Sequence, residues 1–404
     1  MSTSLLYHAF CIRGYEYRSS SYGAGGIRFT IGQPRKSLCC SSCGSSNVFS
    51  KGSVPRVFRS IPIGAKATSI RLDVPRVQCR DCHVERQVRI PFADPKKSYT
   101  HAYERYVLEL SRHMTIKGIA DHLGVGWDLV KGIQRKHLEA RFSPPRLRDL
   151  KRIAIDEISV GKRHKYLTIV LDLESGAIVF VGDGKGEKAL EGFWKRLRSS
   201  RAKIVAVAAD LSPAYALAIR KNLPKAALVF DRFHLVKLLN GHLTDLRREL
   251  YREATDDLQK SVLKGTRWLL LKLSENLDDT RDERQRLEEA LALNQSLAIA
   301  YYLKEDLRQI WEQSCKKMGE FCLDLWIRRA EASGIKQLQK FAKTLRVHRN
   351  GILAWYDHPI STGPLEGTNN KIKLLQRQAY GYRDIVFFKL KLLAIHYSQH
   401  ALVG

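Results

Sequence analysis

The sequence lacks any long hydrophobic run. No stretch of its 404 residues approaches the ~18 uninterrupted apolar residues that a membrane-spanning helix requires. The N-terminus also lacks the basic segment followed by an apolar segment that marks a secretion signal. These absences argue against a membrane-spanning protein and predict a cytoplasmic chain.

Acidic residues are scarce. There are 41 Asp and Glu against 69 Lys and Arg, so the formal net charge is +28 at pH 7. A protein this basic is expected to bind a polyanion; nucleic acid is the commonest one, and a membrane surface is the alternative. With 44% hydrophobic and 27% charged residues, the composition is that of a globular protein rather than a disordered one. The length predicts about two to three domains.

Cysteines are few, and most of them are clustered. Five of the eight lie between Cys39 and Cys82. Because no secretion signal is present, a disulfide framework is not expected, and clustered cysteines in such a chain indicate a metal site.

The sequence contains two Cys-x-x-Cys pairs. Each pair is expected to form a tight turn that directs its two thiolates toward one point, so that the four thiolates together can complete a tetrahedral Zn²⁺ site. Cys39 and His83 are adjacent and could replace a ligand, and chance pairs of buried thiols are the alternative. The predicted zinc ligands are Cys40, Cys43, Cys79 and Cys82.

Residues 103–141 show apolar residues at three- and four-residue spacings, interrupted by Gly124-Val125-Gly126. This pattern predicts a helix-turn-helix motif. Its second helix would direct Trp127, Lys131 and Arg135 toward a DNA groove. Plain helical packing is the alternative interpretation.

After the linker at Pro144-Pro145 the periodicity changes to that of strands. Residues 153–155, 166–172 and 177–181 predict an antiparallel meander of three strands. Residues 204–209 and 226–230 predict two more strands, each preceded by a helix. Three hairpin strands followed by helix, strand, helix, strand is the order of a ribonuclease H-like fold.

Aspartates follow two of these strands. Asp156 ends the first strand and Asp210 ends the fourth, and in a ribonuclease H-like fold these strands are neighbours. Two converging carboxylates need a cation, because their repulsion would otherwise raise one pKa. Oxygen ligands suit Mg²⁺ or Mn²⁺. The alternative is that such aspartates only form turns, as we expect for Asp172.

The last third is almost wholly helical from residue 235 to residue 346. A final helix opens at residue 361, and its residues Glu366, Asn369, Asn370 and Lys373 are predicted to share one polar face. This helix is strongly basic, and its expected DNA contacts are Lys371, Lys373 and Arg377.

Several segments resemble bacterial insertion-sequence transposases of the ISL3 family. The resemblance covers about residues 39 to 395 and includes the two cysteine pairs and the helix-turn-helix. In the first cysteine pair, members of this family commonly have proline directly after the first cysteine. This chain has Ser41 at that position, preceded by both Cys39 and Cys40. The most specific segments are Asp156-Glu-Ile, Asp210-Leu-Ser-Pro-Ala-Tyr215, Asp231-Arg-Phe-His234 and Pro364-Leu-Glu366-Gly-Thr-Asn-Asn.

The resemblance implies a ribonuclease H-like core with a DDE triad, interrupted by an all-helical insertion before the glutamate. Carried over to this chain, the triad is Asp156, Asp210 and Glu366, and these residues would hold Mg²⁺ or Mn²⁺. The implied activity is cleavage and strand transfer at terminal inverted repeats, by a homodimer bound to element and target DNA at the nucleoid. Asp231 and His234 would lie near the metal site; a helix cap and a packed histidine are the alternative.

The expected organisation is thus a multidomain α+β chain. A DNA-binding regulator without activity, and a structure-specific nuclease or resolvase, are the competing hypotheses; an intact set of three acids argues against the regulator. The expected segments are an N-terminal extension (1–38), a zinc ribbon (39–93), a helix-turn-helix domain (100–145), a ribonuclease H-like α/β catalytic core in two parts (150–234 and 347–404) and a helical insertion (235–346).

Overall fold

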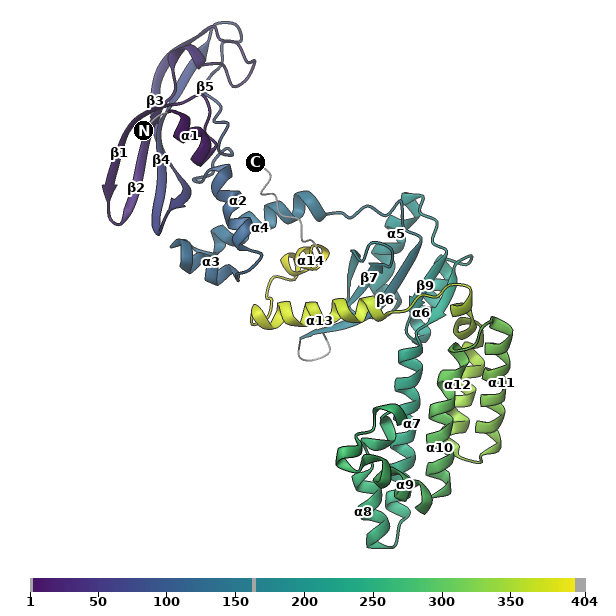
Figure 1. Cartoon of the computed structure of the whole chain (residues 1–404). Helices are drawn as coiled ribbons and strands as arrows, with labels where there is room; N and C mark the ends of the chain where they lie inside the picture. Colours follow the sequence, from purple (N-terminus) through teal and green to yellow (C-terminus); the bar gives the residue numbers. More distant parts are fainter. Residues whose placement is uncertain (1–2, 162–164, 397–404) are drawn as a thin grey trace. The chain divides into compact units, whose positions relative to one another are not determined.

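A computed structural model describes residues 3–161 and 165–396 (Figure 1). The first two residues of the expected extension and residues 397–404 of the expected last segment lie outside this description. The described chain forms two compact units, one ending at Arg141 and the other running from Phe142 to His396. Each unit is considered separately below.

A twisted sheet forms the larger part of the first unit. Its strand order is β1-β2-β4-β3, with the short β5 also paired to β4. The N-terminal residues, in which the sequence shows no motif, supply a helix and two of these strands, and Phe10 of this helix packs on Phe29. The elements are α1 (Thr3–Phe10), β1 (Glu16–Gly23), β2 (Gly26–Gly32), β3 (Val48–Ile63), β4 (Lys66–Cys79) and β5 (Glu85–Gln87).

Three helices complete the first unit: α2 (His101–Leu110), α3 (Ile116–Leu123) and α4 (Trp127–Phe142). The predicted interruption is confirmed, because Gly124 ends α3 with a φ of 58°, a left-handed conformation that glycine adopts without strain. Thr115 begins α3 by accepting a hydrogen bond from the Gly118 amide. Buried residues from all three helices, including Val107, Ile119 and Ile133, form their shared core.

The second unit is built on a five-stranded sheet with the order β10-β9-β6-β7-β8. The predicted meander is confirmed, since β6 and β7, and then β7 and β8, pair antiparallel. The predicted first and fourth strands also pair, because β6 lies parallel to β9. The strands are β6 (Arg152–Gly161), β7 (Lys165–Asp172), β8 (Ile178–Asp183), β9 (Ala206–Ala209) and β10 (Ala227–Phe230).

Helices cover both faces of this sheet (Figure 1). On one face α5 (Glu191–Ser200) and α6 (Pro213–Asn222) pack over residues such as Ile155 and Val207. On the other face α13 (Gly363–Gln378) and α14 (Ile385–Leu393) pack over residues such as Ala154 and Ala208. The alternation of side chains along β6 and β9 therefore decides which residues face α13.

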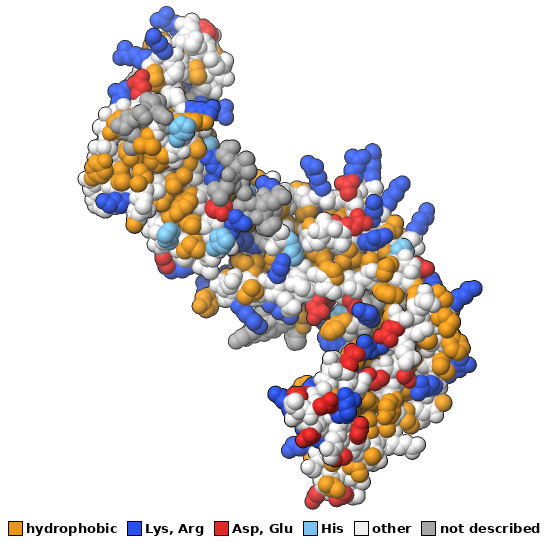
Figure 2. All heavy atoms as spheres, in the orientation of Figure 1, with side chains coloured by type: hydrophobic (Ala, Val, Ile, Leu, Met, Phe, Trp, Pro, Cys, Tyr) orange, Lys and Arg blue, Asp and Glu red, His pale blue; other side chains and the backbone are white. Residues whose placement is uncertain are grey.

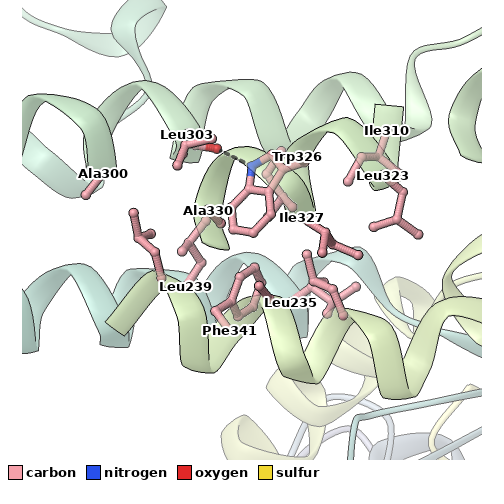
Figure 3. Packing of buried hydrophobic residues seen from close by; sticks show 14 of the residues in the cluster. Leu235, Leu239, Ala300, Leu303, Ile310, Leu323, Trp326, Ile327, Ala330 and Phe341 are labelled. Carbon is pink, nitrogen blue, oxygen red and sulfur yellow. Dashed lines mark hydrogen bonds between the residues drawn. The ribbon is translucent and has the colours of Figure 1, made fainter. Parts of the chain in front are cut away.

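Between β10 and α13 the described chain contains helices and no strand, as the sequence pattern predicted. Their core includes Leu235, Leu239 and Phe341 around Trp326, whose indole N–H donates to the Leu303 carbonyl at 2.7 Å (Figure 3). Acidic side chains are conspicuous on this segment, whereas Lys and Arg prevail around the sheet near α5 (Figure 2). The helices are α7 (Arg232–Glu253), α8 (Asp257–Gly265), α9 (Glu283–Leu293), α10 (Gln295–Asp306), α11 (Lys316–Ala332) and α12 (Lys336–Leu353).

Candidate functional site

Four cysteines meet at the end of the first sheet. The sulfur atoms of Cys40, Cys43, Cys79 and Cys82 all lie within 4.8 Å of one another. Four thiolates at this separation fit a tetrahedral Zn²⁺ site. Cys39 is exposed and lies outside this group, as does His83, so the structure selects Cys40 as the first member.

Local backbone geometry positions these thiols. Gly44 closes the first turn with a φ of 78°, and its amide donates to the Cys40 carbonyl at 2.9 Å. The second turn is tied to the first, because the Asn47 side chain donates to Asp81 at 2.9 Å. Backbone N–H groups of Cys43 and Ser42 lower the pKa of the Cys40 thiol to about 7, which favours the thiolate form that binds metal.

In the second unit, Asp210 directly follows β9, as predicted, whereas Asp156 lies within β6 and not at the end of the strand, because β6 continues to Gly161 in its ladder with β7. Ile155 of β6 is in register with Ala209 of β9, and each aspartate is the next residue. Burial raises the pKa of Asp156; the nearby His234 lowers it and the charge of Asp210 raises it further. The negative charge of Asp210 thus disfavours the ionised form of the Asp156 carboxyl.

Hydrogen bonds orient both aspartates. One oxygen of Asp156 accepts from the Glu157 amide at 2.8 Å, and the other accepts from the side-chain nitrogen of Asn369 at 2.9 Å. Asp210 accepts from the Ser212 amide at 3.0 Å. The link through Asn369 connects β6 directly to α13.

Glu366 lies on α13, one helical turn before Asn369. Leu365 and Ile372 of the same helix pack on the sheet face that carries Ala154 and Ala208, the face toward which Asp156 and Asp210 alternate. Glu366 is exposed and the three acids do not meet at one point. Among the described residues only the four cysteines form a group of three or more His, Cys, Asp or Glu side chains gathered closely enough for one metal ion.

On α13, Asn369 differs in exposure from the three residues with which it was predicted to share a polar face. Only 8% of Asn369 is exposed. It lies on the buried side of the helix because its amide group is used by Asp156. The other three residues are exposed.

Asp231 is a helix cap with a second contact. Its carboxylate accepts from the Phe233 amide at the start of α7 and from the Thr362 amide at 2.7 Å. The Thr362 hydroxyl also donates to it. Thr362 directly precedes α13, so this buried carboxylate determines where the helix that carries Glu366 begins. His234, one turn into α7, is half-buried and near Asp156.

Sequence analysis missed a network on the opposite sheet face. The Tyr215 hydroxyl lies 3.0 Å from the Thr168 hydroxyl, accepts from the Gly186 amide at 3.2 Å and donates to Glu157 at 3.4 Å. These contacts join α6 to β6, β7 and the loop after β8. The sequence did not predict these contacts, because the positions of Tyr215 and Thr168 in the sequence do not indicate which groups their hydroxyls will bond to.

Of the residues predicted to contact DNA, Trp127 and the three on α13 are exposed, whereas Lys131 and Arg135 are half-buried. In α4, Trp127 is 52% exposed and the Lys131 ammonium lies 5.5 Å from the centre of its ring. Arg135 forms an ion pair with Glu139 at 3.8 Å. Lys371, Lys373 and Arg377 are exposed on α13, and the Lys371 ammonium lies 3.3 Å from His396.

No helix within residues 3–161 and 165–396 has the length and apolar character needed to cross a membrane.

Comparison with known proteins places similarities along most of the chain. Residues 153–392, more than half of the chain, match the DDE model of the ISL3 family, described as a transposase. Residues 88–138 match the helix-turn-helix domain of transposase family ISL3. Residues 36–82 match the zinc finger of the IS204/IS1001/IS1096/IS1165 transposases.

Individual relatives agree with these matches. The transposase for insertion sequence element IS1001 of Bordetella parapertussis is 31% identical over 362 residues, covering 89% of each chain. The transposase for IS1557 of Mycobacterium tuberculosis is 29% identical over 400 residues, covering 92% of this chain and 89% of the relative. The Drosophila P element transposase strand transfer complex is a distant structural neighbour, with a TM-score of 0.40 and 11% identity over 74% of this chain and 92% of the neighbour.

Proposed function

The chain belongs to the ISL3 family of DDE transposases, and on this premise we propose that it binds the terminal inverted repeats of an insertion sequence and catalyses metal-dependent cleavage and strand transfer of DNA. One observation carries the proposal. Asp156 and Asp210 each follow a residue of the in-register pair Ile155 and Ala209, and the side chain of Asn369, on the helix that carries Glu366, donates to Asp156.

The proposed core is a ribonuclease H-like domain divided by a helical insertion. The sheet order β10-β9-β6-β7-β8 supports it, because the meander is followed by two parallel strands on the side of β6. The helices α7 to α12 lie between β10 and α13, where an insertion before the glutamate would fall. The proposed domain limits remain 39–93, 100–145, 150–234, 235–346 and 347–404, after an extension of residues 1–38.

The proposed metal ligands are Asp156, Asp210 and Glu366, which would hold Mg²⁺ or Mn²⁺. The residues fit such ions, because all three offer hard oxygen donors and the repulsion between the two aspartates would be relieved by a cation. Two such ions, held by these carboxylates, would supply activation of an attacking water or 3′-hydroxyl and stabilisation of the leaving oxygen.

The protein groups around these acids prepare the site. Asn369 holds the Asp156 carboxylate in one orientation, and Asp231 determines where α13 begins, which positions Glu366. The neighbouring His234 lowers the pKa of Asp156 and so favours its ionised form. The exposed bases of α13, namely Lys371, Lys373 and Arg377, would contact the DNA backbone near the cleaved bond.

End recognition is proposed to lie in the first unit. The helix-turn-helix would present Trp127, Lys131 and Arg135 to the terminal repeat, and the Zn²⁺-bound cysteines would hold the adjoining ribbon in shape. We further propose a homodimer, because the two ends of an element are joined in one reaction, acting on element and target DNA at the nucleoid in the cytoplasm.

Cleavage of terminal-repeat DNA by triad variants tests the proposal. We expect Asp156→Ala, Asp210→Ala and Glu366→Ala to abolish cutting in Mg²⁺ or Mn²⁺ while end binding is retained. Asp172→Ala is the control, because Asp172 only forms a turn, accepting from the Glu174 and Ser175 amides. A Glu366→Ala protein that still nicks the ends would refute the triad. Binding without cutting by the wild type would indicate a regulator, and cutting without joining a nuclease.

A further inference from the structure

The sheet of the first unit has one face covered by its core, and its other face carries exposed and half-buried polar residues. Strand pairing arranges polar residues in rows across the open face. Ser21 pairs with Arg28, Arg28 lies beside Ser69, and Ser69 pairs with Arg59. In the next row Thr30 lies beside Arg71. We call these six residues the open face: Ser21, Arg28, Thr30, Arg59, Ser69 and Arg71.

A hollow of about 620 Å³ lies at this part of the sheet. It is bounded by the β1–β2 turn around Tyr22 and Gly26, by Ala67 and Ser69 of β4, and by Arg59. Ala24 and Gly25 both have positive φ angles, as this tight turn requires. The hollow is lined by hydroxyl and guanidinium groups as well as apolar atoms, so it does not have the character of a purely apolar pocket.

The charge of the open face is largely unneutralised. Arg28 is exposed, and its side chain has no hydrogen bond or ion pair within the described parts of the chain. Arg71 has one exposed partner, Asp73, at 3.9 Å. Residues 1–38 contain a single acidic residue, Glu16, against Arg13, Arg18, Arg28, Arg35 and Lys36.

Arg59 connects this face to the helix-turn-helix. Its guanidinium donates to the Leu123 carbonyl at 3.0 Å, at the end of α3 and just before the turn into α4. The Arg59 backbone is also bonded to Ser98 and Thr100, and Thr100 caps α2. The open face and the turn before α4 therefore lie next to each other within one unit.

We propose that the open face binds the phosphodiester backbone of the DNA that flanks the segment contacted by α4. This inference rests on the proposed function, since it extends the DNA contact of a DNA-binding protein. Guanidinium groups bind phosphate oxygens in two-point contacts, and serine and threonine hydroxyls donate to the same oxygens. Such contacts give affinity and register without reading the base sequence.

Binding of the full-length chain to two duplexes of equal length, one with the terminal repeat and one of random sequence, tests this inference. We expect Arg28→Ala and Arg71→Ala each to weaken binding to both duplexes about tenfold. The slope of log K against log salt should fall by about one for each lost phosphate contact. The preference for the terminal repeat should stay unchanged, and Arg28→Lys should retain part of the affinity.

Arg13→Ala is the matched control. It removes the same charge, but Arg13 stacks on Tyr7 of α1, which packs on the covered side of the sheet. Zinc content and thermal unfolding of each variant show that the unit is folded. If Arg28→Ala and Arg71→Ala bind like Arg13→Ala, with an unchanged salt slope, the open face does not contact DNA.

A separate pair of variants distinguishes this failure from failure of the proposed function. Lys131→Ala in α4 should weaken terminal-repeat binding, whereas Lys117→Ala in α3, where Lys117 pairs with Asp121, should not. If the two variants bind alike and the wild type shows no preference for the repeat, the proposal that α4 recognises the ends is wrong. The salt slopes of the Arg28 and Arg71 variants would still test the role of the open face. A wild type that binds neither duplex would overturn both.

Discussion

At the scale of single residues, the candidate site depends on one amide. Asn369 is buried, and its side-chain nitrogen donates to Asp156 at 2.9 Å. A hydrogen bond to a charged carboxylate is stronger than one between neutral groups. The conformation of Asn369 is therefore better explained by the position of Asp156 than by packing alone.

We expect Asn369→Ala to slow DNA cleavage by roughly tenfold or more, because the loss of a hydrogen bond to a charged group frees the Asp156 carboxylate to rotate. End binding should not change. Asn370→Ala is the control, since Asn370 is the next residue of α13 and is exposed. Equal cleavage rates for the two variants would contradict a positioning role for Asn369.

The cysteine group allows a similar comparison. Purified wild type should contain about one Zn²⁺ per chain, and Cys79→Ser should lose it because three thiolates bind the ion much less tightly. Metal analysis by atomic absorption measures this. Cys39→Ser should keep its zinc, since Cys39 lies outside the four-sulfur group. Zinc loss in Cys39→Ser to the same degree would show that the ligand set is wrong.

At the scale of elements, a buried carboxylate joins two helices that are distant in the sequence. Asp231 begins α7 and also binds the residue before α13. An N-cap alone contributes about 0.5–2 kcal/mol, and a buried amide left without a partner costs about 1–3 kcal/mol more. Asp231 should therefore matter more than an ordinary cap.

Asp231→Ala should lower the free energy of unfolding by about 2–4 kcal/mol, as measured by urea denaturation. Asp256→Ala is the control, because Asp256 caps α8 at an exposed position, where its carboxylate accepts from the Leu258 amide. Its effect should stay within the ~0.5–2 kcal/mol of a cap. Similar losses for both variants would mean that the contact with Thr362 adds nothing.

At the scale of the whole molecule, the excess of positive charge is unevenly distributed. Asp and Glu gather on the helical segment between β10 and α13, and Lys and Arg prevail elsewhere on the visible surface (Figure 2). Cations on both α4 and α13 are exposed. A protein with this distribution should contact many phosphates at once.

Binding to terminal-repeat DNA should therefore depend steeply on salt. Six or more phosphate contacts would lower the affinity by roughly 10³-fold between about 50 and 200 mM salt, because each contact releases counterions. Fluorescence anisotropy over this range measures the slope. Glu366→Ala should show the same slope as the wild type, since the acids serve cutting rather than binding. A flat salt dependence would argue against backbone contacts as the main source of affinity.

Features that depend on short spacings could be predicted from the amino-acid sequence. Cys40 and Cys43, the turn at Gly124 and the alternating strands of the meander are coded by neighbouring residues, whose backbone preferences act locally. Pairing of the first and fourth strands also followed, because the order of elements restricts their topology. Only the tertiary structure decided that Asn369 turns inward to Asp156, 213 residues away, and that Asp231 holds Thr362, 131 residues away. It also placed the N-terminal residues in the sheet, where β2 lies beside β4. Such partners come together only when the chain is folded. The residues next to a side chain in the sequence do not indicate which distant group will form hydrogen bonds with it.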